Sequence, residues 1–159
     1  MSDPERRLRQ MGLQLPCAPT PVAQYVPAAK AGELVFISGQ GPVSDGVPVV
    51  VGRVGGELGE EDGYEAARLC ALNCLAVAKQ FLGSLSQIEK IVHVRGFINS
   101  EPHFANQPAV LNGASDLLVE VFGDEGRHAR AALGVSVLPG NIPVEVEMVL
   151  QAREEAGIG

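Results

Sequence analysis

Two alternating segments in the last third of this 159-residue chain constrain its fold most strongly. Within residues 128–137 and again within 142–150, every second side chain is apolar, and a period of two is typical of a β-strand. The apolar positions are Ala129, Ala131, Leu133, Val135 and Val137 in the first segment, and Ile142, Val144, Val146, Met148 and Leu150 in the second. If both apolar sets enter one core, Arg130, Glu145 and Glu147 should lie together on the opposite face.

The residues between these segments, Pro139-Gly140-Asn141, predict a hairpin turn. Such a hairpin places Ser136 opposite Glu145, so Arg130 and Glu145 would lie about six residues apart, or ~20 Å at ~3.3 Å per residue. Two interpretations remain open from the residues alone. The charges are unrelated groups on a solvated sheet face, or an oligomer brings Arg130 of one subunit to Glu145 of another.

The rest of the chain predicts an α+β domain in which two helices cover one face of a largely antiparallel sheet. Asp3-Pro4-Glu5 has the pattern of a helix start, and Asp62-Gly-Tyr-Glu65 has the spacing of a capping box. The expected elements are a short helix ending near Gly12, strands at 23–29, 34–39 and 47–54, a helix from Asp62 to Gly83, a strand at 88–99, a helix from Ser100 to Phe122, and the two C-terminal strands. After the first helix the order is therefore β-β-β-α-β-α-β-β.

The same patterns divide the chain into an N-terminal helix and proline-rich linker (1–18), one main domain (19–153) and a short tail (154–159). No long apolar run and no basic-then-apolar leader are present, so we expect neither a membrane span nor a secretory signal, and a cytoplasmic location. The net charge of −7 and the 4% aromatic content argue against nucleic-acid binding, which needs basic and stacking side chains.

Cofactor and metal motifs find little support. Cys70 and Cys74 lie four residues apart on a predicted helix without a histidine nearby, which favours small buried thiols over a metal site. The glycines after residue 39 match neither a dinucleotide-binding nor a P-loop pattern. We therefore expect no cofactor and no metal, with Gly39 free to let a ligand approach the backbone.

Three blocks in the right order carry a resemblance to a known family. They are Tyr25 with Ile37-Ser38-Gly39-Gln40-Gly41-Pro42-Val43, then Arg130 with Leu138-Pro139, then Val144-Glu145-Val146-Glu147. Together they resemble the YjgF/RidA family of reactive-intermediate (enamine/imine) deaminases, from about Pro19 to Gln151. The resemblance implies a chorismate mutase-like fold and a homotrimer with clefts between subunits. The N-terminal segment would mark a branch with an extension.

The resemblance also implies a chemistry, the hydrolysis of small 2-imino or enamine acids to 2-oxo acids and ammonia. Arg130 would clamp the substrate carboxylate, and Glu145 would orient the attacking water or move its proton. The substrate-binding residues that the resemblance implies are Tyr25, Ser38, Gly39 and the backbone of Ala132. Two further candidates follow from position: His128, on the strand face of Arg130, is an acid or base near pH 7 or a hydrogen-bonded rim residue, and Asn112 on the second long helix could donate across the interface. Proteins of this kind are often described as endoribonucleases, but the net charge of −7 does not favour RNA cleavage by this chain.

One departure concerns the two residues after the arginine. Well-known members carry Ser and Cys there, whereas this chain has Ala131 and Ala132, so no cysteine nucleophile can act at that place. Imine hydrolysis needs no thiol, but the substrate preference would change. The alternative function is a non-catalytic trimer that binds a small carboxylate.

Overall fold

The computed structural model describes residues 3–155; residues 1–2 and 156–159, the latter forming most of the expected C-terminal tail, lie outside the described residues. Five strands form one sheet in the order β1-β2-β7-β5-β6, and β3 and β4 form a separate two-stranded sheet. The strands are β1 Ala28–Ala31, β2 Leu34–Gln40, β3 Val43–Ser44, β4 Val47–Pro48, β5 Ile88–Asn99, β6 Ala129–Val135 and β7 Val144–Ala152. The helices are α1 Pro4–Gln10, α2 Glu60–Leu82 and α3 Gln107–Phe122, with short 3-10 turns η1 Leu85–Gln87, η2 Gly123–Gly126 and η3 Pro139–Asn141.

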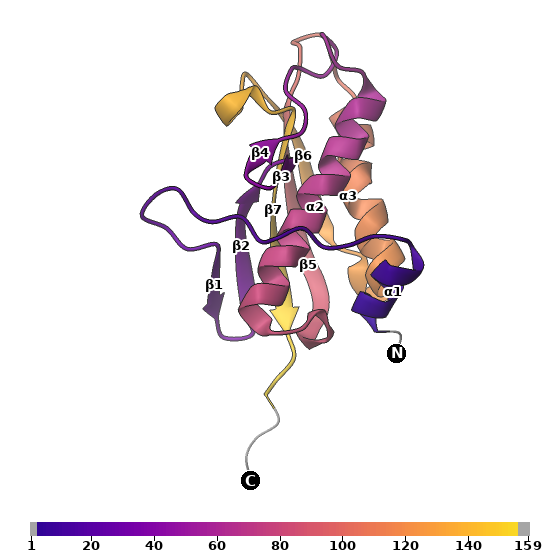
Figure 1. Cartoon of the computed structure of the whole chain (residues 1–159). Coiled ribbons are helices and arrows are strands. Elements are labelled where there is room, and N and C mark those ends of the chain that lie inside the picture. The colour runs from indigo at the N-terminus through magenta and orange to yellow at the C-terminus, as the bar shows by residue number, and fades with distance from the viewer. Residues whose placement is uncertain (1–2, 156–159) are drawn as a thin grey trace.

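Helices α2 and α3 pack side by side on one face of the main sheet, as predicted (Figure 1). In β7 the buried and half-buried residues alternate along the whole strand, which is the expected consequence of one covered and one open face. The sheet is mostly antiparallel, with β5 and β6 as its parallel pair. The predicted α+β class is therefore confirmed.

The N-terminal helix begins as the sequence indicates. The Asp3 side chain accepts a hydrogen bond from the Glu5 amide, and Pro4 occupies the first turn, where a missing N–H costs nothing. Buried Leu8 anchors the helix, and the Arg7 guanidinium donates to the carbonyl of Glu120 in α3. The chain then crosses over α2 to reach β1 (Figure 1).

Several boundaries differ from the sequence prediction. Helix α2 starts at Glu60 because Asp62 accepts from the amide of Gly59, so Asp62 is the third helical residue and not the cap. Helix α3 starts only at Gln107, since residues 101–106 form a loop in which the amide of Glu101 donates to Val54. The strand expected at 88–99 has the predicted bounds.

Two predicted strands are largely wrong. The first strand covers residues 28–31 and not 23–29; of the expected 47–54 strand only Val47–Pro48 forms a strand, while Val54 makes isolated bridges to Leu58 and Ser100. After Pro48 the chain leaves the strand conformation. Gly52 has a φ of 127°, which residues with a side chain rarely adopt, and its amide donates to the Asn141 carbonyl. This valine-rich segment therefore forms a loop for most of its length.

The predicted hairpin between the last two strands is also wrong. Strand β6 pairs in parallel with β5, and β7 pairs antiparallel with the other side of β5. The connection 136–143 spans two strand spacings of ~5 Å each instead of one tight turn. Strand β5 lies between β6 and β7, and the helices cover its fully buried Ile91, Val94 and Ile98; an apolar strand of this kind suits an interior place in the sheet, where it pairs on both sides.

The two long helices approach so closely at Gly113 of α3 that no side chain fits between them. A Cβ added to Gly113 would lie 2.0 Å from the carbonyl oxygen of Tyr64 and 3.2 Å from the amide nitrogen of Arg68, both in α2. Because both contacts are with backbone, only a separation of the helices could relieve them.

We predict that Gly113→Ala lowers the free energy of unfolding by more than about 3 kcal/mol, since overpacking outweighs the ~1 kcal/mol gain in helix propensity. Urea unfolding followed by circular dichroism measures this change. Asn112→Ala, at the exposed neighbouring position, is the control and should shift stability by less than about 0.5 kcal/mol. Equal stability of both variants would contradict the close helix contact.

Candidate functional site

Arg130 lies on the outermost strand, β6, and on the helix-covered side of the sheet. Its register partner in β5 is Val94, whose own partner in β7 is Met148, and both are buried beneath the helices. The exposed guanidinium turns towards α3, where Nη1 donates to the Ser115 hydroxyl at 3.1 Å and Nη2 to the Pro108 carbonyl at 3.4 Å. The expectation that Arg130 shares a face with the carboxylates is therefore wrong.

Glu145 and Glu147 lie on the open face of the central strand β7. Their neighbours Val144 and Val146 are fully buried, and the backbone carbonyls of these valines contact the thiols of Cys70 and Cys74 in α2. The side chains of Glu145 and Glu147 therefore point away from the helices. The apolar residues Ala131 and Leu133 of β6 share this face with the carboxylates, because the alternate positions of β6 that include Arg130 face the helices.

A β-bulge in β2 brings Ser38 and Gly39 beside the carboxylates. The register shifts between Ile37 and Gln40, so both bulge residues stand opposite Glu147 alone. A Cβ on Gly39 would lie 3.0 Å from the carboxyl carbon of Glu145, so only glycine leaves room for this contact. The hydroxyl of Ser38 donates to the Val26 carbonyl at 2.7 Å and so ties the bulge to the loop that carries Tyr25.

An open cavity of about 540 Å³ lies beside the bulge on the open face of the sheet, lined by Ser38 and Glu147 but not by Gly39 or Glu145. Tyr25 and Ser38 line one side, and His93, Arg95 and Glu147 line another. Arg95 and Glu147 form an ion pair of 3.0 Å across neighbouring strands. The ring of Tyr25 is 52% exposed beside this cavity. We call Tyr25, Ser38, Gly39 and Glu145 the carboxylate half-site.

Glu145 is the titratable group of this half-site with a displaced pKa. Partial burial, and after it the negative charge of Glu147, raise the pKa of the Glu145 carboxyl above its usual value. A carboxyl of this kind exchanges protons nearer to neutral pH than an exposed one does, which suits a group that guides water.

A second set of predicted residues gathers around Arg130 at the sheet edge. His128 Nε2 and the Ser115 hydroxyl lie 2.8 Å apart, and His128 Nδ1 lies 2.6 Å from the Gly126 carbonyl. Ala132 follows Arg130 on the same side of β6, next to Gly96 of β5, while Asn112 is exposed on α3. We call Ser115, His128, Arg130 and Ala132 the arginine half-site, and the role of Asn112 stays a prediction. Ser115 was not predicted, because a lone serine within a helix carries no sequence signal.

His128 is half-buried and uncharged at neutral pH. Burial lowers the pKa of its imidazole, the hydrogen bond to Gly126 raises it, and the charges of Arg130 and His93 lower it further. The pKa of His128 therefore lies below its usual value of 6.5.

The two half-sites do not meet within one chain. Glu145 pairs with Phe97 of β5, which pairs with Leu133 of β6, so Glu145 and Arg130 are two strands and about three residues apart, or ~14 Å between backbones. They also lie on opposite faces. The predicted hairpin separated Arg130 and Glu145 along the strand direction, whereas the structure separates them across two strands and onto opposite faces. In both arrangements the two residues are too far apart to form one site.

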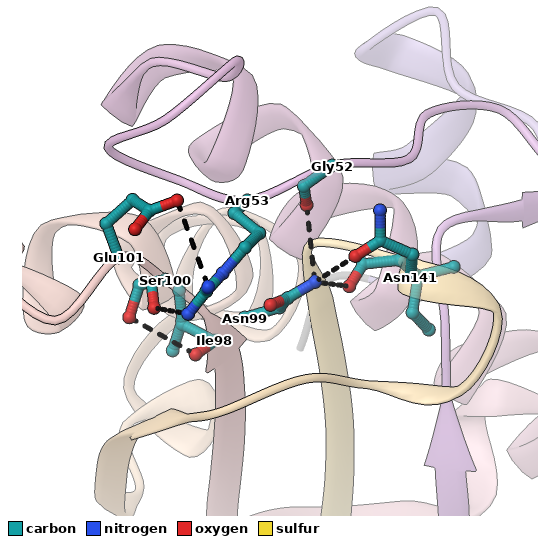
Figure 2. A network of polar contacts seen from close by, with 8 residues as sticks. Gly52, Arg53, Ile98, Asn99, Ser100, Glu101 and Asn141 are labelled. Atoms are coloured by element: carbon teal, nitrogen blue, oxygen red, sulfur yellow. Dashed lines mark hydrogen bonds and ion pairs between the residues drawn. The ribbon is translucent and has the colours of Figure 1, made fainter.

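A separate polar network closes the end of the sheet near β6 (Figure 2). The amide nitrogen of buried Asn99 donates to Asn141 Oδ1 at 2.9 Å and to the Ile142 carbonyl at 3.1 Å, and Arg53 donates to the Ser100 carbonyl at 2.6 Å. This network joins three loops to the end of β5. It explains how the loop 49–59 is held without a strand, and sequence patterns did not reveal it.

The described residues show neither a metal-binding cluster nor an ionised thiol. Within residues 3–155 no group of three or more His, Cys, Asp or Glu side chains could hold a metal ion. Burial raises the pKa values of the Cys70 and Cys74 thiols, which keeps both protonated. No helix in the described part of the chain is long and apolar enough to cross a membrane.

We predict that Glu145→Gln stabilises the folded chain at pH 7. A raised carboxyl pKa means that the folded state favours the protonated form, so wild-type stability falls as the pH rises above the unfolded value of 4.5. Glu145→Gln cannot ionise and so lacks this loss of stability. The difference in unfolding free energy between the variant and the wild type should disappear below about pH 4. Urea midpoints between pH 3.5 and 8 measure the difference.

Glu65→Gln, at an exposed position of α2, is the matched control and should bring no gain at pH 7. A Glu145→Gln variant that is no more stable at pH 7 than at pH 4, relative to wild type, would contradict the raised pKa.

Comparison with known proteins places this geometry in a family. The family described as "YjgF/chorismate_mutase-like, putative endoribonuclease" matches residues 5–151. Protein TCP17 of Trypanosoma cruzi is 40% identical over 145 residues, which are 91% of either chain. The RutC family protein PH0854 of Pyrococcus horikoshii is 28% identical over 83% of this chain and 90% of its own.

Solved structures agree with the fold over nearly the whole chain. Atu1372 of Agrobacterium tumefaciens superposes with a TM-score of 0.88 at 41% identity, covering 94% of this chain and 93% of its own. A Shewanella oneidensis protein named as a "putative endoribonuclease" superposes with a TM-score of 0.91 at 36% identity, covering 94% and 99%. From its α+β architecture, its sequence blocks and these matches, the chain belongs to the YjgF/chorismate mutase-like (RidA/RutC) family.

Proposed function

We propose that the protein hydrolyses small 2-imino and enamine acids to 2-oxo acids and ammonia, in clefts between the subunits of a homotrimer. The observation that carries this proposal is the separation of the two half-sites. An anion-binding arginine at one sheet edge and a half-buried carboxyl with a raised pKa on the open face lie too far apart in one chain, but each is accessible to a second copy.

The surface of the described chain supports such an assembly. Strand β6 is an edge strand, whose outward backbone groups have no partner strand among residues 3–155. The open face carries exposed apolar side chains, among them Phe36 at 47% and Leu133 at 44%. Another copy of the chain would bury both features, and a closed ring of three leaves no edge open.

The proposed reaction needs binding and water activation but no covalent intermediate. The Arg130 guanidinium binds the substrate carboxylate through two parallel N–H donors and so orients the C=N carbon. Glu145 of the neighbouring subunit accepts a proton from the attacking water, whose oxygen bonds to that carbon. Glu145 passes this proton to the nitrogen, which gives a carbinolamine; the proton of the new hydroxyl group then follows to the nitrogen, so that the C=O bond forms as the C–N bond breaks and ammonia leaves. An enamine reacts as its imine tautomer.

The remaining predicted residues have supporting roles in this scheme. Gly39 allows the substrate to approach the β2 backbone, Ser38 keeps the bulge in shape, and the exposed Tyr25 ring covers the cleft. Asn112 and His128 border the carboxylate end. The methyl group of Ala132 leaves more room beside Arg130 than a larger side chain would, which favours substrates with a bulkier side chain than the smallest imines.

A binding function without catalysis is the second candidate, favoured by the apolar Ala131 and Ala132 next to the arginine. Cleavage of RNA has less support. The net charge is −7. In the basic N-terminal segment Arg6-Arg7-Leu8-Arg9, the Arg7 guanidinium donates to the Glu120 carbonyl.

We predict that the purified protein accelerates the hydrolysis of imines generated in situ from several amino acids, measured as 2-oxo acid or ammonia release. Arg130→Ala should lower kcat/KM at least about 100-fold, because it removes a charge-assisted bidentate contact. Arg130→Lys keeps the charge without the planar fork and should recover part of the rate. Saturable binding of 2-oxo acids without any acceleration would favour the binding function.

A mixing experiment tests whether the site is shared between subunits. Arg130→Ala and Glu145→Gln should each be inactive alone, yet unfolding and refolding them together should restore activity. In a random trimer, a site works when one subunit keeps Arg130 and its neighbour keeps Glu145, which about one site in four satisfies. Recovery of about a quarter of the wild-type rate is expected; no recovery, with trimers formed, would contradict the shared site.

A further inference from the structure

We infer that Ser115 and His128 are positioning residues of Arg130, which hold its guanidinium in place only while the His128 ring is uncharged. The inference rests on the proposed function in so far as Arg130 binds the substrate carboxylate. It goes beyond that function by assigning a role to a helix serine and by making substrate binding depend on pH.

The first step is the direction of the hydrogen bonds around the histidine. A carbonyl oxygen can only accept, so the contact of 2.6 Å between Nδ1 and the Gly126 carbonyl places a hydrogen on Nδ1. In a neutral ring Nε2 is then the acceptor. The hydroxyl of Ser115, 2.8 Å away, must donate to it.

The second step follows from the orientation of this hydroxyl. With its hydrogen directed at His128, the Ser115 oxygen presents its lone pairs to the other side. There Arg130 Nη1 donates to it at 3.1 Å. The chain of bonds therefore runs from Arg130 to Ser115, from Ser115 to His128, and from the other ring nitrogen to Gly126, and every member is correctly donated or accepted.

The second guanidinium nitrogen is held as well. Arg130 Nη2 donates to the carbonyl of Pro108, in the first turn of α3, at 3.4 Å. Two contacts to α3 restrict the rotation of an otherwise exposed side chain and reduce the entropy lost when a carboxylate binds. Ser115 supplies the shorter of these contacts.

Protonation of His128 would break this arrangement. An imidazolium donates from both nitrogens, so Ser115 would have to accept from two cations at once, and its own hydrogen would lose its partner. His128 and Arg130 also lie two residues apart on one side of β6, or ~7 Å, where like charges repel.

The groups that face the ring favour its neutral form. The ring contacts the uncharged Ser115 of α3, Arg130 lies on the same side of β6, and His93 of β5, on the open face, acts on the ring through its charge alone. Burial and both basic neighbours lower the pKa of His128, against the opposing contact with Gly126. The ring is therefore neutral at pH 7 and charges only below its usual value of 6.5, so Arg130 should be held at neutral pH and released in acid.

The first test observes the arginine directly and needs no turnover. In the ¹⁵N-labelled full-length protein at pH 7.5, restricted rotation should give Arg130 two separate Nη signals, assigned by their absence in Arg130→Lys. Ser115→Ala should merge them, whereas Ser115→Thr, which keeps the hydroxyl, should preserve them. In the wild type they should merge in acid, with the midpoint of the His128 ring titration, and His128→Gln should remove this pH dependence.

The second test is kinetic. Ser115→Ala should raise KM for a 2-imino acid about 5- to 10-fold with little change in kcat, because it affects the placement of the carboxylate and not the attack of water. Ser115→Thr should restore KM to within about 2-fold of wild type. The wild-type KM should rise below pH 6.5, and this acid limb should be absent in His128→Gln. Ser136→Ala, an exposed serine near the end of the same strand, is the control and should match wild type.

The outcomes separate the two proposals. If the wild type hydrolyses no imine, the proposed function fails, while the Nη signals still decide whether Ser115 holds Arg130. If Ser115→Ala keeps separate Nη signals, or its KM and pH profile match wild type, the positioning role is overturned. Fold loss does not obscure the result, because Ser115→Thr and Ser136→Ala report on the folded chain.

Discussion

The place of β5 between β6 and β7 is the constraint on which the rest of the molecule depends. Its fully buried Ile91, Val94 and Ile98 suit an interior place beneath the helices, where β5 pairs on one side with the edge strand β6 and on the other with the central strand β7. Once β6 pairs in parallel with β5, its alternate residues are assigned to faces by register. Arg130 then falls on the helix side and Glu145 on the open side.

This arrangement divides the candidate chemistry into two half-sites with different supports. The carboxylate half-site rests on a β-bulge, where Gly39 leaves just enough space for Glu145. The arginine half-site rests on α3, whose Ser115 and Pro108 receive the guanidinium. Each half is built on rigid elements, so a second copy of the chain needs only to dock correctly to complete the proposed site.

Membership of the family is established by the match over residues 5–151, and the activity of this chain is a separate question. The alanines after Arg130 remove any nucleophile from that position, and the Arg130, Ser115 and His128 chain adds a pH-sensitive support on the other side. The alanines and the hydrogen-bonded chain both affect how Arg130 binds the carboxylate of a substrate. The differences between this chain and other members should therefore be found in substrate choice and pH dependence before they are found in the chemical step.

The sequence by itself determined the α+β class, the bounds of β5, the cap of α1 and the alternation of β7, because these depend on local periodicity and on side chains within a few residues. It also pointed to Arg130 and Glu145 through the family blocks. Only the tertiary structure decided that β6 and β7 form no hairpin, that residues 49–54 form a loop, and that Arg130 faces α3 beside Ser115. Strand partners and faces depend on which distant segment buries the most apolar surface, and alternation within one strand cannot reveal which of its two sides that segment will cover.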